Sequence, residues 1–174
     1  DARHRALSAG MQMPARTGPV RIGLVAGEAS GDALGAALIE ALRERLPCVE
    51  FIGLAGARMR AAGCEALGDS GELAVMGLVE PLRHLPRLLK LRARLLRTFT
   101  ERRIDLFVGV DAPAFNLGLA RRLRARGIAT AQYVSPQVWA WRRGRVKSIA
   151  RAVERVLCLL PFEPEVYAGQ PVGA

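Results

Sequence analysis

Residues 20–35, VRIGLVAGEASGDALG, decide the fold class of this protein. The first seven of them, Val20–Ala26, are almost continuously apolar, which predicts a strand buried on both faces. A glycine-bearing turn follows, and leucines at every fourth position from Leu34 to Leu46 predict a helix over Asp32–Leu46 that Pro47 ends. A strand that leads through a tight turn into a helix is typical of α/β proteins.

The rest of the chain repeats this alternation and predicts a doubly wound, Rossmann-like α/β domain with a parallel sheet. Further strands are expected at Val49–Leu54, Asp105–Val110, Ile128–Val134 and Arg155–Leu160, and further helices at Arg58–Ala62, Leu82–Arg103, Phe115–Arg126 and Arg145–Val153. The run Leu73–Val79 is compatible with either a strand or a helix. Ligands of such folds bind at the carboxyl ends of the strands, so we expect functional residues in the loops that follow them.

Composition narrows the class of protein. The 174 residues include 26 Lys and Arg against 16 Asp and Glu, a net charge of +10, and 51% are hydrophobic, which excludes wholesale disorder. Three cysteines without a C-x-x-C pair and only two histidines argue against a disulfide framework and against a metal site. We expect one domain over residues 20–166, an unstructured extension over 1–19 and a truncated linker over 167–174.

Two loops carry carboxylates where a parallel sheet would hold its ligand. In the first, Gly27–Asp32, Ser30 or Asp32 could cap the following helix, whereas Glu28 could accept hydrogen bonds from a hydroxylated ligand. The glycine spacing matches neither a dinucleotide-binding loop nor a P-loop. In the second, Asp111 directly follows an apolar strand, so it could act as a general base or could instead cap the next helix. Both interpretations of each loop stay open on pattern alone.

The loop after the predicted strand Ile128–Val134 contains both tryptophans of the chain. Trp139 and Trp141 lie two residues apart and precede a cluster of cations that comprises Arg142, Arg143, Arg145 and Lys147. Aromatic rings beside cations suit sugar faces, nucleotide bases or lipid headgroups. The alternative is that one ring packs in the core while the other shields the loop.

Positive charge concentrates in a predicted amphipathic helix. Its cations recur at steps of four and three and so share one face, which we call the basic stripe; they are Arg83, Arg87, Lys90, Arg94 and Arg97. Leucines occupy most of another face, and an apolar segment precedes the helix. This pattern predicts contact with an anionic membrane surface, although a solvated face over a core-packed helix is the alternative. No nucleic acid is expected as a partner, because no such motif is present and aromatic residues make up only 5%.

Six ordered motifs together resemble the N-terminal half of the bacterial lipid-A-disaccharide synthase family. They are LVAGEASGD at Leu24–Asp32, AGARMRAAG at Ala55–Gly63, LAVMGLVE at Leu73–Glu80, VDAPAFN at Val110–Asn116, YVSPQVWAW at Tyr133–Trp141 and LCLLPFE at Leu157–Glu163. The resemblance implies a GT-B glycosyltransferase, in which two Rossmann-like domains face each other. A related GT-B transferase of another lipid-linked sugar and a non-catalytic membrane-binding module are the alternatives.

The resemblance also implies an activity. Enzymes of this family transfer 2,3-diacylglucosamine from UDP-2,3-diacylglucosamine to 2,3-diacylglucosamine 1-phosphate with inversion, forming a β-1,6 bond and releasing UDP, without a metal or cofactor. We expect the donor-binding domain to lie outside these 174 residues, so turnover by this chain alone is not expected. The uncovered inner face would favour a homo-oligomer, and the implied location is cytoplasmic, peripheral on the inner membrane.

The expected site residues follow from the loops and from the resemblance. We expect Asp111 and Glu28 to be catalytic and the substrate contacts to come from Ser30, Gly31, Asp32, Asn116, Ser135 and Trp139. We expect the membrane contacts to come from Val75, Met76, Leu78, Val79, Leu82, Arg83, Arg87 and Lys90.

Overall fold

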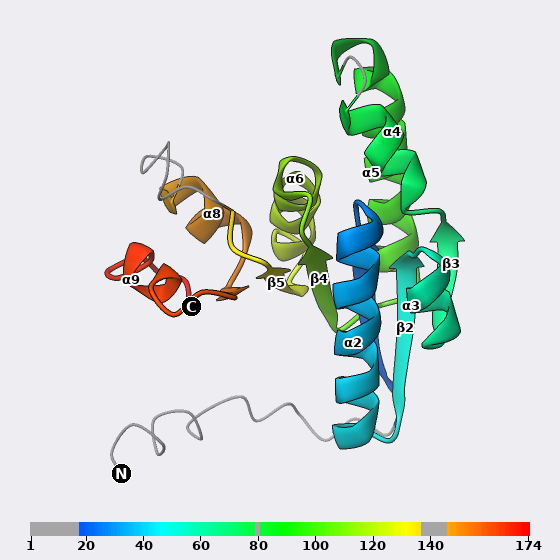
Figure 1. The fold of residues 1–174 in the computed structure, drawn as a ribbon, viewed down its shortest axis with the longest axis horizontal. Coiled ribbons are helices and arrows are strands. Elements are labelled where there is room, and N and C mark those ends of the chain that lie inside the picture. Colours follow the sequence, from blue (N-terminus) through cyan, green and yellow to red (C-terminus); the bar gives the residue numbers. More distant parts are fainter. Residues whose placement is uncertain (1–17, 79–80, 137–145) are drawn as a thin grey trace.

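A computed structural model of the chain describes residues 18–78, 81–136 and 146–174. Six strands form one sheet in the order β3-β2-β1-β4-β5-β6, and every neighbouring pair is parallel. The strands are β1 (Val20–Ala26), β2 (Val49–Leu54), β3 (Cys64–Gly68), β4 (Leu106–Val110), β5 (Ala129–Tyr133) and β6 (Arg155–Leu157). The predicted fold class, a doubly wound parallel sheet, is confirmed (Figure 1).

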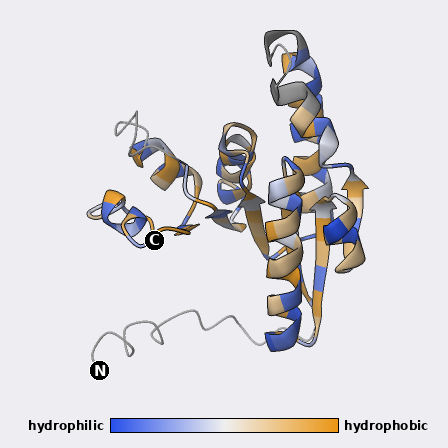
Figure 2. Cartoon of the chain, in the orientation of Figure 1, coloured by the Kyte–Doolittle hydropathy of each residue, from blue (hydrophilic) through white to orange (hydrophobic). Residues whose placement is uncertain are grey.

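Helices cover both faces of the sheet. They are α2 (Ala29–Arg45), α3 (Ala57–Ala61), α4 (Gly71–Leu78), α5 (Pro81–Glu101), α6 (Pro113–Arg124), α8 (Val146–Ala152) and α9 (Glu163–Val166). One apolar core lies between the sheet and the helices α2 and α3, and a second lies between the sheet and α5, α6 and α8. In Figure 2, β2 is coloured mostly as hydrophobic, whereas hydrophilic and apolar positions alternate along α2. The strands are apolar on both faces because both faces are covered.

The strand order creates a switch point between β1 and β4. From β1 the chain runs outward to β2 and β3, then returns to the centre and runs outward on the other side through β4, β5 and β6. The connecting helices therefore cover opposite faces of the sheet on the two sides of this point. Open α/β sheets bind their ligands at such a point, outside the carboxyl ends of the strands.

The structure differs from the predicted elements in several places. Leu73–Val79 was ambiguous, and α4 shows that most of it is helical. The strand β3 and the short helix α9 were not predicted: β3 is a five-residue edge strand with a partly exposed, irregular burial pattern, so it lacks the apolar run that marks the central strands. The helix α2 begins at Ala29, three residues earlier than predicted.

The segment after Val166 packs on the domain instead of leaving it as a linker. The Tyr167 side chain is buried. Gly173 pairs with β6 through two main-chain hydrogen bonds, since the Val156 amide donates to the Gly173 carbonyl at 2.7 Å and the Gly173 amide donates to the Glu154 carbonyl at 2.9 Å. The structured part of the domain thus reaches Gly173, beyond the expected boundary. The expected extension over residues 1–19 falls almost wholly outside the described residues.

Candidate functional site

The turns after β1 and β4 meet at the switch point. Ala26 and Val110, the last residues of the two strands, are paired in register, so the residues that follow them are neighbours. A Cβ added to Gly27 would clash with the Cβ of Ala112, which shows how closely the turns approach. Glu28 and Asp111, the two carboxylates predicted to act together, therefore lie on touching turns at the carboxyl edge of the sheet.

Asp111 is partly exposed at this edge. Within the part of the chain that the structure describes, its carboxylate has no hydrogen-bond or ion-pair partner. The alternative that Asp111 caps the following helix is wrong, because the N-cap of α6 is Ala112 and no side chain caps it. Asp111 and Ala112 both have left-handed backbones, with φ of 53° and 41°. Non-glycine residues rarely adopt this conformation, and strained pairs of this kind cluster at functional sites.

Two buried side-chain amides hold the main chain of Asp111. The Asn116 amide donates to the Asp111 carbonyl at 2.8 Å and to the Val25 carbonyl at 3.2 Å, and the Gln132 amide donates to the same Asp111 carbonyl at 2.9 Å. Asn116 is fully buried, and these hydrogen bonds give it a structural task. Gln132 was not among the predicted site residues, although a glutamine in the apolar strand ATAQY is a signal that could have found it.

The first turn of α2 divides the residues predicted there into exposed and buried ones. Glu28 is the N-cap of α2; its side chain makes no capping bond and is exposed, so it is free to meet a ligand. Ser30 is also exposed. Gly31 is buried, and a Cβ added to it would lie 3.4 Å from the Val110 carbonyl oxygen. Gly31 therefore packs α2 against the end of β4 and offers no side chain to a substrate.

Asp32 serves a different helix from the one it was expected to cap. Its carboxylate accepts hydrogen bonds from the main-chain amides of Gly56 at 2.8 Å, Arg58 at 2.9 Å and Met59 at 3.2 Å. These amides form the start of α3, whose positive end favours a carboxylate. With both oxygens engaged and the residue buried, Asp32 anchors α3 to α2.

Another buried polar pair supports the end of β5. The hydroxyls of Ser135 and Tyr167 lie 2.8 Å apart, and both side chains are buried. Burial raises the pKa of Tyr167, while the hydrogen bond with Ser135 lowers it. Ser135 therefore joins the loop after β5 to the C-terminal segment. Trp139 lies outside the described residues.

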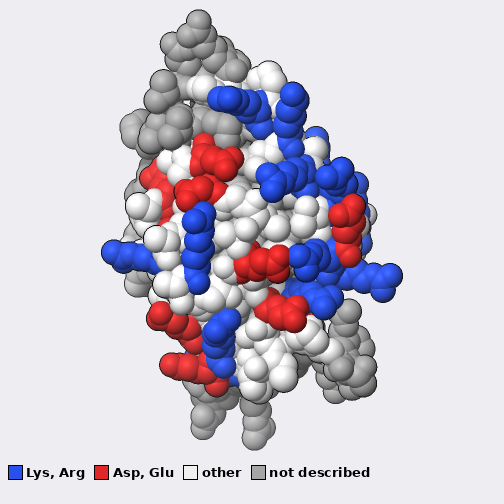
Figure 3. Space-filling view, turned by 90° about the vertical axis from the view of Figure 1, so that its right-hand side faces the viewer, with Lys and Arg blue, Asp and Glu red and all other residues white. Residues whose placement is uncertain are grey.

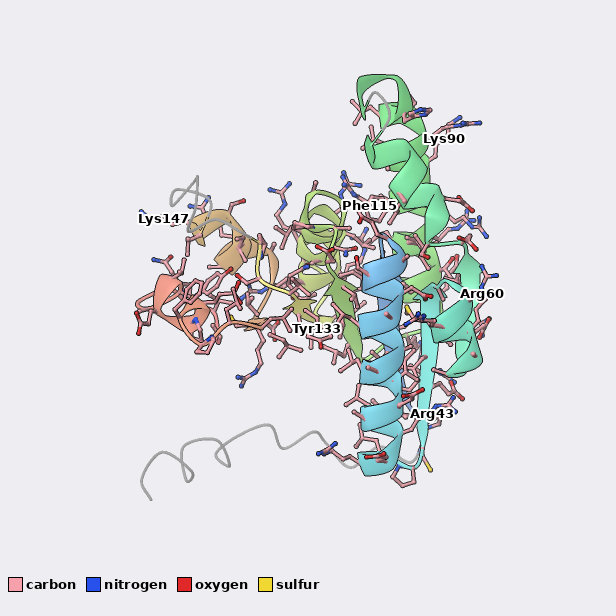
Figure 4. The ribbon with its side chains drawn as sticks, in the orientation of Figure 1. Arg43, Arg60, Lys90, Phe115, Tyr133 and Lys147 are labelled. Atoms are coloured by element: carbon pink, nitrogen blue, oxygen red, sulfur yellow. The ribbon has the colours of Figure 1, made fainter. Side chains whose placement is uncertain are left out.

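The basic stripe is divided along α5. At the C-terminal end of the helix, Arg94 donates to the Leu67 carbonyl at 2.9 Å and Arg97 pairs with Glu101 at 3.8 Å, so both cations serve the domain itself. Arg87 and Lys90, nearer the N-terminal end, are exposed. Figure 4 shows Lys90 extending outward from the part of α5 that lies far from the sheet. In Figure 3, Lys and Arg gather at the upper right of the face viewed, whereas the two signs mix elsewhere on that face.

The apolar face of α5 is divided in the same way. Leu95 is 1% exposed and Phe99 is buried in the core, but Leu85 and Leu89 are 48% and 44% exposed. The alternative of an ordinary core-packed helix thus holds only for the second half. Of the other predicted membrane contacts, Val75, Met76 and Leu78 lie in α4, Leu82 and Arg83 begin α5, and Val79 lies outside the described residues. No helix in the described ranges is long and apolar enough to span a bilayer.

A charged side chain also links α5 to α6. The Arg92 guanidinium lies 5.0 Å from the centre of the Phe115 ring, and Figure 4 shows Phe115 on the side of α6 that faces α5. Burial lowers the pKa of Arg92, and the neighbouring cations Arg122 and Arg121 lower it further. A Cβ added to Gly118 would lie 2.8 Å from the Arg92 guanidinium carbon, so the glycine makes room for this contact. The second half of α5 is held against the domain by this contact.

Comparison with known proteins agrees with the motifs. The model of a family described as lipid-A-disaccharide synthetase matches residues 22–174. Among curated proteins, the lipid-A-disaccharide synthase of Xanthomonas campestris pv. campestris strain 8004 is 54% identical over 160 residues, covering 92% of this chain and 36% of that protein. Those of Sodalis glossinidius and Photobacterium profundum are 58% and 56% identical over 149 and 151 residues, which is 86% and 87% of this chain and 39% and 40% of those proteins.

The chain thus spans between a third and two fifths of the length of these relatives. Since the family model covers nearly all of the described sheet and its helices, the chain belongs to the lipid-A-disaccharide synthetase family.

Proposed function

We propose that this chain is the acceptor-side domain of a lipid-A-disaccharide synthase. The reaction transfers 2,3-diacylglucosamine from UDP-2,3-diacylglucosamine to the 6-hydroxyl of 2,3-diacylglucosamine 1-phosphate with inversion. Membership of the family supports the reaction class. The coverage of its relatives supports a second domain that would hold most of the UDP-sugar in a GT-B arrangement. The observation that carries the proposal is that partly exposed Asp111 lies on a turn in contact with the turn that carries exposed Glu28, at the switch point.

Asp111 is assigned the role of general base. Its carboxylate takes the proton from the acceptor 6-hydroxyl while that oxygen attacks the anomeric carbon of the donor from the face opposite UDP. The new C–O bond forms as the bond to UDP breaks, and UDP leaves with the electron pair. Glu28, exposed on the neighbouring turn, orients the acceptor through its hydroxyls. Ser30 and Trp139 remain proposed substrate contacts.

The start of α5 is assigned to the membrane surface on the cytoplasmic side of the inner membrane. Exposed Leu85 and Leu89 would enter the headgroup boundary, while Arg87 and Lys90 would attract anionic lipid. In Figure 1, α4 and the start of α5 extend beyond the carboxyl ends of the strands. An acylated sugar held in the membrane would thus reach the edge that carries Asp111.

The catalytic assignment is tested with Asp111→Asn. The assay uses a polypeptide that contains these 174 residues completed to the length of the relatives, and it measures disaccharide and UDP formation. Loss of a general base should lower kcat at least about 100-fold, while the urea midpoint of unfolding stays unchanged. Glu44→Gln, at an exposed carboxylate near the end of α2, is the matched control and should keep its kcat. An Asp111→Asn enzyme with wild-type kcat would refute the base and favour a binding module.

The membrane assignment is tested by sedimentation of the chain with vesicles. Binding to phosphatidylglycerol vesicles should exceed binding to phosphatidylcholine vesicles and should weaken as salt rises. Leu85→Ser combined with Leu89→Ser should release the protein. Leu46→Ser, at a leucine exposed after α2, should not. Binding that ignores both salt and lipid charge would contradict the assignment.

A further inference from the structure

The left-handed backbone at Asp111 and Ala112 needs an external restraint. Neither residue is a glycine, and two consecutive left-handed residues are unfavourable in an isolated chain. Strained conformations persist only where the surrounding structure over-determines them. The groups that hold this turn therefore also determine the position of the Asp111 carboxylate.

Two buried amides supply the restraint from opposite elements. Asn116 reaches the Asp111 carbonyl from α6, and Gln132 reaches it from β5, at 2.8 and 2.9 Å. Both partners of the Asn116 amide are carbonyls, which can only accept hydrogen bonds, so the orientation of its nitrogen is determined. The Asn116 side-chain oxygen is left buried without a partner among the described residues. An unsatisfied buried acceptor is unfavourable. The opposite orientation of the amide would be worse, because it would place this oxygen against two carbonyl oxygens and lose both donated bonds.

The sheet is built around these two amides. Gly109 lies in β4, two residues before Asp111, and a Cβ there would lie 2.6 Å from the Asn116 Cβ and 2.8 Å from the Gln132 side-chain oxygen. A side chain at this position would push both amides away from the turn. Gln132 is 1% exposed in a strand whose buried neighbours are small or apolar, where a glutamine is costly without hydrogen bonds.

We propose that Gln132 and Asn116 are positioning residues, which hold the Asp111 carbonyl from two sides and thereby keep the strained turn, and with it the carboxylate, in place for proton transfer. Neither residue touches the substrate. The proposal rests on the proposed function for its catalytic consequence, but the restraint itself is a property of the folded domain. A base displaced from its working position loses rate even when it keeps its chemistry.

The first test needs no substitution. In NMR spectra of the wild-type chain, couplings across the hydrogen bonds should connect the side-chain nitrogens of Gln132 and Asn116 with the Asp111 carbonyl carbon. The 3J(HN–Hα) couplings and backbone shifts of Asp111 and Ala112 should report positive φ. Absence of both couplings, or negative φ at Asp111, would overturn the proposal. This result does not depend on any variant folding.

The second test separates positioning from stability. Gln132→Met keeps the length of the side chain but removes the donor. Thr130→Val is the matched control, because Thr130 is equally buried on β5 and donates to a main-chain carbonyl, that of Ala152 at 3.3 Å, far from the turn. In the length-completed enzyme, Gln132→Met should lower kcat by about 10- to 100-fold with KM within about twofold. Thr130→Val should leave kcat and KM unchanged even if its unfolding midpoint falls as far as that of Gln132→Met.

The outcomes distinguish this proposal from the proposed function. A Gln132→Met enzyme that keeps its kcat, with Asp111 still at positive φ, overturns the positioning role. An Asp111→Asn enzyme that keeps its kcat removes the base, while the couplings to the Asp111 carbonyl still decide whether the amides hold the turn. A loss of kcat in Gln132→Met and Thr130→Val alike would show general destabilisation and would also overturn the proposal.

Discussion

Asp32→Ala removes a carboxylate that ties α3 to α2. The carboxylate accepts three main-chain hydrogen bonds from the start of α3, a segment 24 to 27 residues further along the chain. Asp32 is 6% exposed, so water does not readily replace the lost oxygens. The substitution should therefore lower the free energy of unfolding without altering any group that faces the carboxyl edge.

The size of the loss follows from the three donors. The amides of Gly56 and Met59 belong to buried residues and would be left without partners, whereas Arg58 is exposed and its amide can turn to water. An unsatisfied buried amide costs about 1–3 kcal/mol. Two of them give about 4 kcal/mol, a large part of the roughly 5–15 kcal/mol that stabilises a typical domain.

Urea unfolding of the 174-residue chain, followed by far-UV circular dichroism, measures this loss. With a slope of about 2 kcal/mol per molar urea, the midpoint should fall by about 2 M. The midpoint of Asp32→Asn should fall less than that of Asp32→Ala, because the amide keeps one acceptor oxygen. It should still fall, because the NH2 group faces a main-chain donor. Ser30→Ala, at an exposed neighbour on the same turn, should change stability by less than about 0.5 kcal/mol. A loss below about 1 kcal/mol for Asp32→Ala would refute the anchoring role.

The remaining predictions concern the thiols and the turn at Gly27. Burial, with a smaller contribution from the Glu65 carboxylate, raises the pKa of Cys64 from 9.0 to about 12, so iodoacetamide at pH 8 should alkylate exposed Cys48 long before Cys64, as peptide mass spectrometry would show. Because the folded thiol keeps its proton while the unfolded one loses it, stability should fall as pH rises from 9 towards 12, and Cys64→Ala should flatten that fall; an unchanged slope would contradict the buried thiol. Gly27→Ala should displace Ala112 and lower kcat, and the rise in activation free energy should exceed the loss in free energy of unfolding. An enzyme with wild-type kcat would show that the turns are not in contact.

The sequence was sufficient for the fold class and for the edge of the sheet at which Glu28 and Asp111 lie. Apolar runs of strand length alternate with helical periodicity, and such periods are local properties that survive without knowledge of the partners. Parallel strands end at one edge, so the carboxylates after Ala26 and Val110 were expected to share that edge, and the paired register of these two residues brings them together. Both carboxylates could be named because Asp111 directly follows its strand and Glu28 follows its strand after a single glycine.

Other assignments depended on contacts between distant segments. Asp32 looked like a cap for its own helix, but its partners lie on α3. Asn116 and Ser135 looked like ligand contacts because they follow strands, and both are buried against main chain or Tyr167. Polar residue types in a loop show what a side chain can bond, but not whether it faces water or the interior.

The periodicity of this sequence determined which segments are strands and helices and that carboxylates gather where the strands end. Tertiary structure alone decided that Leu85 is exposed while Leu95 on the same apolar face is buried, and that amides from α6 and β5 converge on the carbonyl of Asp111. The reason is physical: periodicity arises from bonds and contacts within a few residues, whereas burial and hydrogen-bond partners depend on which distant surfaces the packing brings together.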